Sequence, residues 1–226
     1  MIYYDQEFGE VEVIFSRRKS ISIGIKVDSS QVVIKSGIKL TKSEVVDLIT
    51  RHRDWLRKKM AKINRSAEYK HTFTLGDNFM YLGRSYPLIE GERAIFSGVA
   101  FEVTNLQDTA QVKLELERIY RELARNYLGC HLKFTANKFK ISYNQMRITS
   151  ASTRWGSCTS KGNINFPWNL IMCPEELVDY VVCHELAHRL QMNHSAEFWR
   201  EVERMCPNYR VFRKLLKLNS LLYANF

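Results

Sequence analysis

The sequence predicts a mixed α+β fold, and three patterns lead to that expectation. Apolar and polar residues alternate near the N-terminus, which is the period of a half-buried strand. Long segments further on place apolar residues at the spacing of amphipathic helices. Short apolar runs separated by glycine-containing turns are typical of further strands. We expect a β-rich N-terminal region with one helix over residues 1–110, and a helical region with a short sheet over 111–226.

The first 40 residues show the strand alternation most clearly. After the turn-like residues 28–30, a second apolar run covers 32–34. Together the two segments predict a β-hairpin with one buried face. The first run alternates Ile21, Ile23, Ile25 and Val27 with Ser22, Gly24 and Lys26.

A basic helix is expected over residues 42–65. Thr41 and Glu44 have the spacing of a capping box, and apolar residues follow at helical intervals. The outer face of this helix would attract polyanions, so weak, non-specific binding of nucleic acid is one expected property. Its basic residues are Arg51, Arg53, Arg57, Lys58, Lys59, Lys62 and Arg65.

The middle of the chain predicts a β-meander, a long helix and a strand pair. Four turn-like segments interrupt the apolar runs of residues 71–104. Helical periodicity resumes over residues 112–138. Residues 147–171 read as extended, with residues 160–163 as the turn between two strands.

Composition indicates a globular protein of a reducing compartment. The 226 residues carry a formal net charge of +10 and 45% hydrophobic residues, and no uncharged apolar stretch is long enough for a membrane span. The five cysteines form no regular framework. No signal peptide is recognisable, so we expect a cytoplasmic protein with no membrane partner.

The chemistry is expected on a third helix, which Pro174 opens. Residues 184–188 read His-Glu-Leu-Ala-His, the H-E-x-x-H pattern. Two histidines four residues apart lie on one helical face, so both can bind one metal ion, with Glu185 beside them. Catalytic zinc has three protein ligands and an open position for water. The motif therefore predicts a Zn²⁺-dependent hydrolase with Glu185 as the general base.

His194 is the expected third ligand. It can meet His184 and His188 only if the helix ends between residues 190 and 193, because ten residues along a continuous helix would carry it off their face. Ser195 can then cap a following helix. Glu197 and Glu201 on that helix are the alternative third ligands, and a purely structural metal site is the alternative role.

These C-terminal residues resemble the YgjP-like metallopeptidases, which are relatives of the SprT-like zinc peptidases. The resemblance implies a zincin-like core, three histidine ligands on zinc, a glutamate base and a protein or peptide substrate. Some SprT-like relatives act on DNA-bound proteins, so two alternatives are such a peptidase and a nucleic-acid-associated protein with a structural metal. The resemblance rests on 154–158 (Arg-Trp-Gly-Ser-Cys), Asn165, 179–188, 193–195 and Phe198-Trp199.

Residues outside the metal motif have less specific assignments. Trp155, Gly156 and Ser157 are candidate substrate-binding residues, because a strand beside the metal helix can pair with an extended peptide. The alternative is that Trp155 fills the core and Gly156 marks a bulge. Tyr180 lies one turn before His184 and is expected to pack there. The candidates for stabilising an oxyanion are Arg154, Asn208 and Tyr209.

Overall fold

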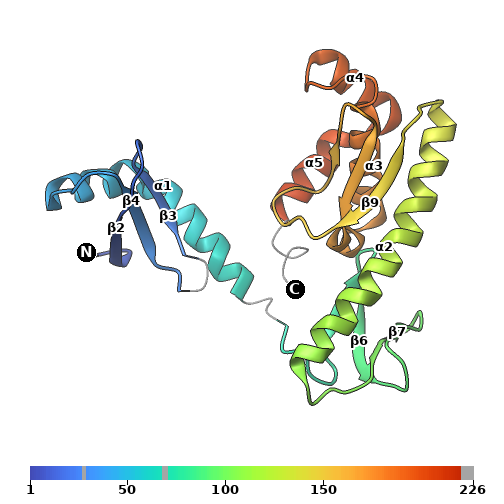
Figure 1. The fold of residues 1–226 in the computed structure, drawn as a ribbon, viewed down its shortest axis with the longest axis horizontal. Coiled ribbons are helices and arrows are strands. Elements are labelled where there is room, and N and C mark those ends of the chain that lie inside the picture. The colour runs from blue at the N-terminus through green and yellow to red at the C-terminus, as the bar shows by residue number, and fades with distance from the viewer. Residues whose placement is uncertain (27–28, 68–70, 220–226) are drawn as a thin grey trace. The chain divides into compact units, whose positions relative to one another are not determined.

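The computed structural model describes residues 1–26, 29–67 and 71–219, and it divides the chain into two compact units. The first unit is Met1–Lys70 and the second is His71–Phe226. Each unit has its own mixture of strands and helices, so the α+β class is confirmed (Figure 1). The division follows Lys70, whereas the sequence had suggested a boundary after residue 110.

The first unit contains a four-stranded sheet in the order β1-β2-β4-β3. Its strands are β1 (Ile2–Asp5), β2 (Gly9–Phe15), β3 (Ser22–Ile25) and β4 (Val32–Ser36). The expected hairpin is present as the antiparallel pair β3–β4, with Ile25 opposite Val32. Val27 and Asp28 lie outside the described residues. The pair β2–β4 is parallel, which the sequence did not predict.

Helix α1 (Lys42–Ala67) covers one face of this sheet (Figure 1). The predicted capping box is present: the Thr41 N–H donates to Glu44 Oε2 at 2.8 Å, and the Glu44 N–H donates to Thr41 Oγ1 at 3.3 Å. Apolar residues at helical spacing on α1 pack into one buried cluster with Val11 and Ile34 of the sheet. The unit therefore has a core of its own.

The second unit begins with a four-stranded sheet in the order β5-β6-β8-β7. Its strands are β5 (Asn78–Tyr81), β6 (Arg84–Glu90), β7 (Ile95–Phe96) and β8 (Phe101–Val103). The expected meander is wrong in its connectivity, because β6 pairs in parallel with β8 and β7 lies at the edge. The side chains explain this order: Phe101 of β8 is fully buried, whereas Ile95 of β7 is half exposed.

The long helix α2 (Thr109–Phe139) packs on this sheet, which is why residues 71–110 belong to the second unit. Phe101 and Tyr120 pack with ring centroids 4.9 Å apart in a tilted arrangement, and the Tyr120 hydroxyl donates to the Met80 carbonyl oxygen at 2.7 Å. Asp108 caps the helix, and Lys140 closes it in the left-handed conformation.

A three-stranded sheet in the order β10-β11-β9 follows α2. Its strands are β9 (Gln145–Thr149), β10 (Ser157–Cys158) and β11 (Asn163–Pro167). The predicted turn at residues 160–163 joins the antiparallel pair β10–β11, whereas β9 and β11 are parallel. Residues Trp168–Met172 form a 3₁₀ helix, η1, so the extended conformation expected up to residue 171 ends at Pro167.

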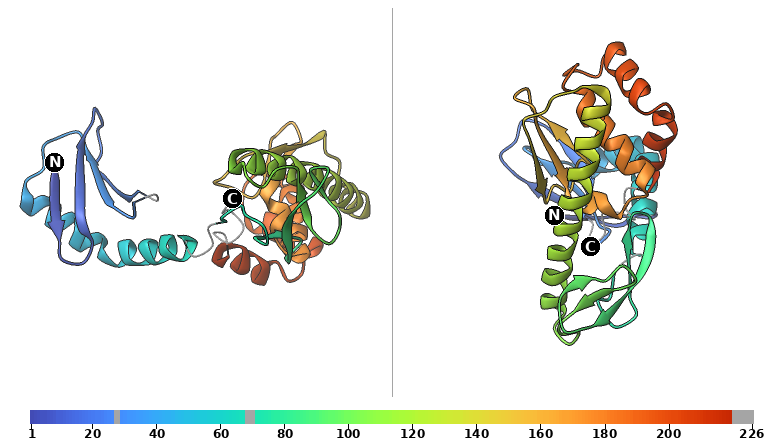
Figure 2. Two further views of the ribbon diagram at one scale, coloured as in Figure 1. Left: turned by 90° about the horizontal axis from the view of Figure 1, so that it is seen from below. Right: turned by 90° about the vertical axis from the view of Figure 1, so that its right-hand side faces the viewer.

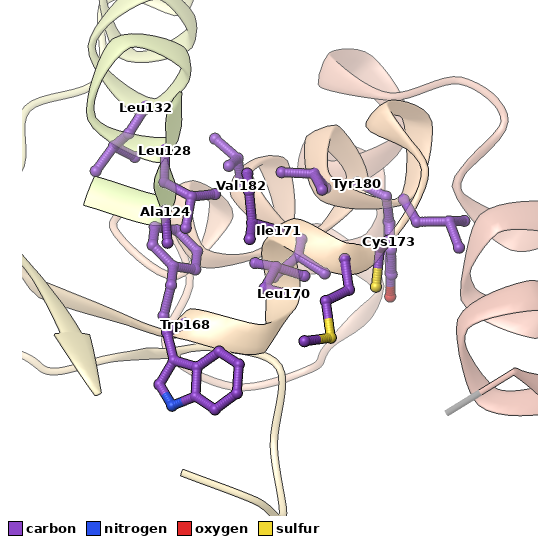
Figure 3. Packing of buried hydrophobic residues seen from close by; sticks show 14 of the residues in the cluster. Ala124, Leu128, Leu132, Trp168, Leu170, Ile171, Cys173, Tyr180 and Val182 are labelled. Atoms are coloured by element: carbon purple, nitrogen blue, oxygen red, sulfur yellow. The ribbon is translucent and has the colours of Figure 1, made fainter. Parts of the chain in front are cut away.

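Three helices complete the second unit: α3 (Glu175–Ala187), α4 (Ala196–Met205) and α5 (Tyr209–Leu218). They lie together with β9 in the views of Figures 1 and 2. Leu128 and Leu132 of α2, Ile171 of η1 and Val182 of α3 belong to one buried cluster (Figure 3). This packing holds α3 rigidly by its apolar face. Within the described ranges, no helix combines the length and apolarity that crossing a bilayer requires.

Candidate metal centre

Helix α3 presents His184 and His188 together. Pro174 stands at its N-cap, and His184 lies in its last turn with its ring centroid 5.1 Å from that of His188. The helix ends at Ala187, before the expected limits of 190–193. Beyond it the N–H groups of Arg189 and Leu190 donate three residues back, a tightening of the last turn that satisfies otherwise free carbonyls. His188 is thus the C-cap residue.

The early end of α3 lets the chain turn back and bring His194 to the same place. His194 Nε2 lies 3.2 Å from His184 Nε2. Ser195 then starts α4, accepting a hydrogen bond from the Phe198 N–H at 3.4 Å as the predicted cap. This geometry agrees with the expectation from the sequence. The helix ends before His194, and the chain then turns back and brings the three histidines together.

The three imidazoles have the spacing that one metal ion requires. One ligand nitrogen from each of His184, His188 and His194 lies within 4.8 Å of the others. Two nitrogens about 2.0–2.1 Å from a tetrahedral zinc ion would be separated by roughly 3.4 Å, close to the His184–His194 distance. Among the described residues, no other group of three or more His, Cys, Asp or Glu side chains has such spacing.

Phe198 packs against all three rings from one side, a role that the sequence did not reveal. Its ring centroid is 4.9, 4.5 and 4.7 Å from those of His184, His188 and His194. The side chain is fully buried, so it limits the movement of all three imidazoles. Trp199 stacks on His194 with centroids 5.7 Å apart. Two sequence signals pointed to Phe198: its place in the Phe198-Trp199 pair of the family resemblance, and its position in the first turn of the capped helix.

Burial keeps His184 and His188 in the neutral form, which is the form that binds metal. It lowers the pKa of His184 to about 3, with the neighbouring histidines adding to the shift. It also lowers the pKa of His188. His188 Nδ1 lies 3.2 Å from the Gln191 carbonyl oxygen, which can only accept, so Nδ1 carries the proton and Nε2 is free to be a ligand.

Glu185 places a buried carboxyl group beside the histidines. Only 4% of the residue is exposed, and its Oε2 atom has no hydrogen-bond partner among the described residues. Burial raises the pKa of Glu185 to about 8, while the positive charge of Arg154 opposes the shift. A buried acceptor without a partner is costly unless a ligand or water completes it. The donor set therefore fits a bound cation and its water.

Gly156 contacts this carboxyl group across the fold. A methyl group at Gly156 would lie 2.7 Å from Cδ and Cγ of Glu185, so only glycine leaves space there. Ser157 lies on the opposite face of the strand, where its Oγ accepts from Asn165 Nδ2 at 3.2 Å. Trp155 is half-buried and packs against the main core, as its alternative interpretation expected.

The two alternative ligands are not part of the three-histidine group, whereas Tyr180 contacts one member of it. Glu197 and Glu201 form ion pairs with Arg200 and Arg204, and neither belongs to the three-histidine group. Tyr180 is buried and meets His184 edge-on at 5.9 Å, which agrees with the expected packing.

The three candidates for oxyanion stabilisation lie in different surroundings. Arg154 is close enough to Glu185 to affect its pKa. Tyr209 is buried and stacks on Trp199 at 5.3 Å, and its hydroxyl accepts from Arg210 Nε at 3.1 Å. Asn208 precedes α5 as its N-cap residue.

Comparisons with known proteins show which family this chain matches. Residues 21–219 match the family model described as the YgjP-like metallopeptidase domain. The comparison with curated proteins found no similar sequence. Among solved structures, the metallopeptidase zymogen of Pyrococcus abyssi abylysin is similar at 23% identity, covering 40% of this chain and 93% of that one, with a TM-score of 0.37.

Proposed function

The chain belongs to the YgjP-like metallopeptidase family, and on that premise we propose that it is a zinc-dependent peptidase. His184, His188 and His194 would hold the zinc ion in a zincin-like arrangement. The observation that carries this proposal is the convergence of three imidazole nitrogens within 4.8 Å beside a buried, unpartnered carboxyl group. The family implies protein or peptide substrates.

The zinc ion and Glu185 would have different roles in hydrolysis. A bound zinc ion supplies Lewis acidity, which makes water a nucleophile near neutral pH and polarises the scissile carbonyl. Glu185 accepts the proton of the attacking water and later donates it to the leaving amine. The carboxyl group is buried and its Oε2 atom has no hydrogen-bond partner among the described residues, so it is available to exchange a proton with that water. The positive charge of the nearby Arg154 favours the ionised carboxylate of Glu185.

We assign substrate alignment to the segment of Trp155, Gly156 and Ser157. In the order β10-β11-β9, strand β10 stands at one edge, so its outer backbone groups can pair with an extended peptide. Gly156 brings that backbone into contact with Glu185. A peptide paired with β10 would therefore pass the proposed general base.

Cleavage of an unfolded protein tests this function. The purified protein, its chelated form and the chelated form after addition of zinc would be incubated with casein, alongside Glu185→Gln. We expect cleavage by the zinc-containing wild type alone, and a loss of at least about 10²-fold in Glu185→Gln, because general acid–base assistance has this magnitude. Zinc content measured on the same samples must remain unchanged in Glu185→Gln. Equal cleavage by the variant would show that another group is the base.

We propose weak nucleic-acid binding by α1 as a second property, which would be compatible with action on DNA-bound proteins. Trp55 is 43% exposed, and Lys59 Nζ lies 4.8 Å from its ring centroid, so a base could stack beside a positive charge. The positive charge that α1 can offer to nucleic acid is smaller than the sequence suggested, because Arg51, Arg53 and Arg57 are paired with acidic side chains. The side chains of Lys62 and Arg65 lie outside those described.

A further inference from the structure

A hollow of about 310 Å³ opens on the face of the β10-β11-β9 sheet that carries Ser157 and Asn165. Arg154, Gly156 and Ser157 line it from β10 and the segment before it, and Asn165 lines it from β11. The hydrogen bond between Asn165 and Ser157 shows that their side chains share this face. Ile164 and Phe166 are buried on the other face. The hollow can take one amino-acid side chain.

The hollow adjoins the proposed catalytic centre at Gly156. Gly156 lines the hollow and also contacts the carboxyl group of Glu185. Side chains of an extended peptide alternate between the two faces of a sheet. In a peptide paired with β10, residues flanking the scissile bond would therefore alternate between the metal side and the hollow.

The charge of the hollow is positive. Arg154 is the one charged residue among those that line it in the described structure, and the others are polar or apolar without charge. The Arg154 side chain is exposed to solvent. A guanidinium group offers a fork of donors that matches a carboxylate. Ser157 and Asn165 add neutral polar groups to the lining.

We propose that this hollow is a specificity subsite for an acidic side chain of the peptide substrate, with Arg154 as the residue that recognises its carboxylate. The inference rests on the proposed peptidase function and adds a substrate class to it: peptides with Asp or Glu close to the scissile bond. A C-terminal carboxylate has the same chemistry, and the experiment below distinguishes it from a side chain.

Binding to the Glu185→Gln protein tests the subsite without requiring cleavage. The probes are acetylated eight-residue peptides of Ala, Val and Ser, in which one Glu is moved through successive positions and compared with Gln at the same position. Each peptide is prepared with a C-terminal acid and with a C-terminal amide. At one position we expect Glu to bind at least about threefold more tightly than Gln, an effect of the size of an exposed ion pair. The preference should shrink at high salt.

Charge reversal identifies the residue responsible. In the Glu185→Gln background, Arg154→Glu should abolish the preference for Glu and favour Lys at that position. The matched control Arg125→Glu changes the net charge equally on the exposed surface of α2, and it should leave the preference unchanged.

Four results would overturn the subsite. Glu and Gln peptides could bind equally, or neither could bind. The preference could follow the terminal acid instead of the side chain. Arg154→Glu could weaken the binding of all peptides equally. A Glu preference in a protein whose wild type cleaves no peptide would support the subsite and refute the proposed peptidase activity.

Discussion

A methyl group at Gly156 would lie 2.7 Å from the carboxyl carbon of Glu185, although 28 residues separate the two positions in the sequence. Glu185 is only 4% exposed, so its side chain has little space into which to move. The segment that carries Gly156, just before β10, therefore determines where the carboxylate lies. The proposed general base depends on the absence of a side chain at this position.

Gly156→Ala should reduce peptide cleavage by at least about 10²-fold while zinc remains bound. The added methyl group displaces the carboxylate, and loss of general-base assistance has this magnitude. Overpacking should also lower the free energy of unfolding by about 1–3 kcal/mol. Cleavage of casein and zinc content would be measured on the same preparation.

Gly129→Ala is the matched control for this variant. Gly129 lies within helix α2, and a methyl group there meets only Met146 Cε of β9 at 3.7 Å, an ordinary van der Waals contact. Its activity should be unchanged and its stability slightly increased. The double variant Gly156→Ala/Glu185→Gln should be no less active than Glu185→Gln alone. Full activity of Gly156→Ala would contradict the proposed dependence.

His194→Ala should weaken zinc binding by more than about 100-fold, since loss of a ligand should exceed the effect of losing a residue that only supports one. Zinc affinity would be measured by competition with a chromogenic chelator. Glu197→Ala and Glu201→Ala test the two alternative ligands, whose carboxylates are paired with arginines. Both should bind zinc normally. If His194→Ala retained its zinc and one of the glutamate variants lost it, the ligand set would have to change.

Metal-free wild type should lose stability relative to metal-free Glu185→Gln as the pH rises from about 5 to 8. The pKa of Glu185 is raised to about 8 in the folded protein from an ordinary value of 4.5, so the folded state holds a proton that the unfolded state has released. Stability from this group is therefore complete below pH 4.5 and is lost as the pH rises through 8. The difference should reach up to about 4 kcal/mol.

Urea unfolding of both metal-free proteins at pH 5, 6.5 and 8 would measure this difference. Comparing them cancels the contributions of the histidines, which both proteins share. Bound zinc should reduce the difference in stability between the wild type and Glu185→Gln, because a nearby cation favours the ionised carboxylate of Glu185. Parallel stability curves would show that Glu185 is ionised in the metal-free protein.

Lys58→Glu/Lys59→Glu should abolish any binding of single-stranded DNA, because these lysines flank the exposed Trp55 of α1. For the wild type we expect weak binding at low salt. A shallow salt dependence is expected, with a log–log slope of about 0.7 per phosphate neutralised on a single strand. Fluorescence anisotropy with a labelled oligonucleotide would measure both quantities.

The pair Lys133→Glu/Lys161→Glu makes the same change in charge on exposed sites of the second unit. It should bind like the wild type if α1 carries the interaction. No binding by the wild type at low salt would remove nucleic acid from the proposed partners. An equal loss in both double variants would attribute binding to the net charge of +10.

The sequence by itself determined the features that depend on neighbouring residues. The capping box of Thr41 and Glu44, the cap at Ser195 and the helical spacing of His184 and His188 could all be predicted, because hydrogen bonds and helical periodicity act over a few residues. The placement of His194 followed from the same local rules, since a continuous helix could not bring it back.

The tertiary structure decided what depends on contacts between distant segments. Parallel pairing of β6 with β8 and of β9 with β11 joins strands that are not consecutive, so local patterns gave no register for either pair. The hollow beside Arg154 and the contact between Gly156 and Glu185 likewise require β10 to lie against α3. Such contacts depend on which buried side chains fit together in three dimensions, and the spacing of residues along the chain does not encode that fit.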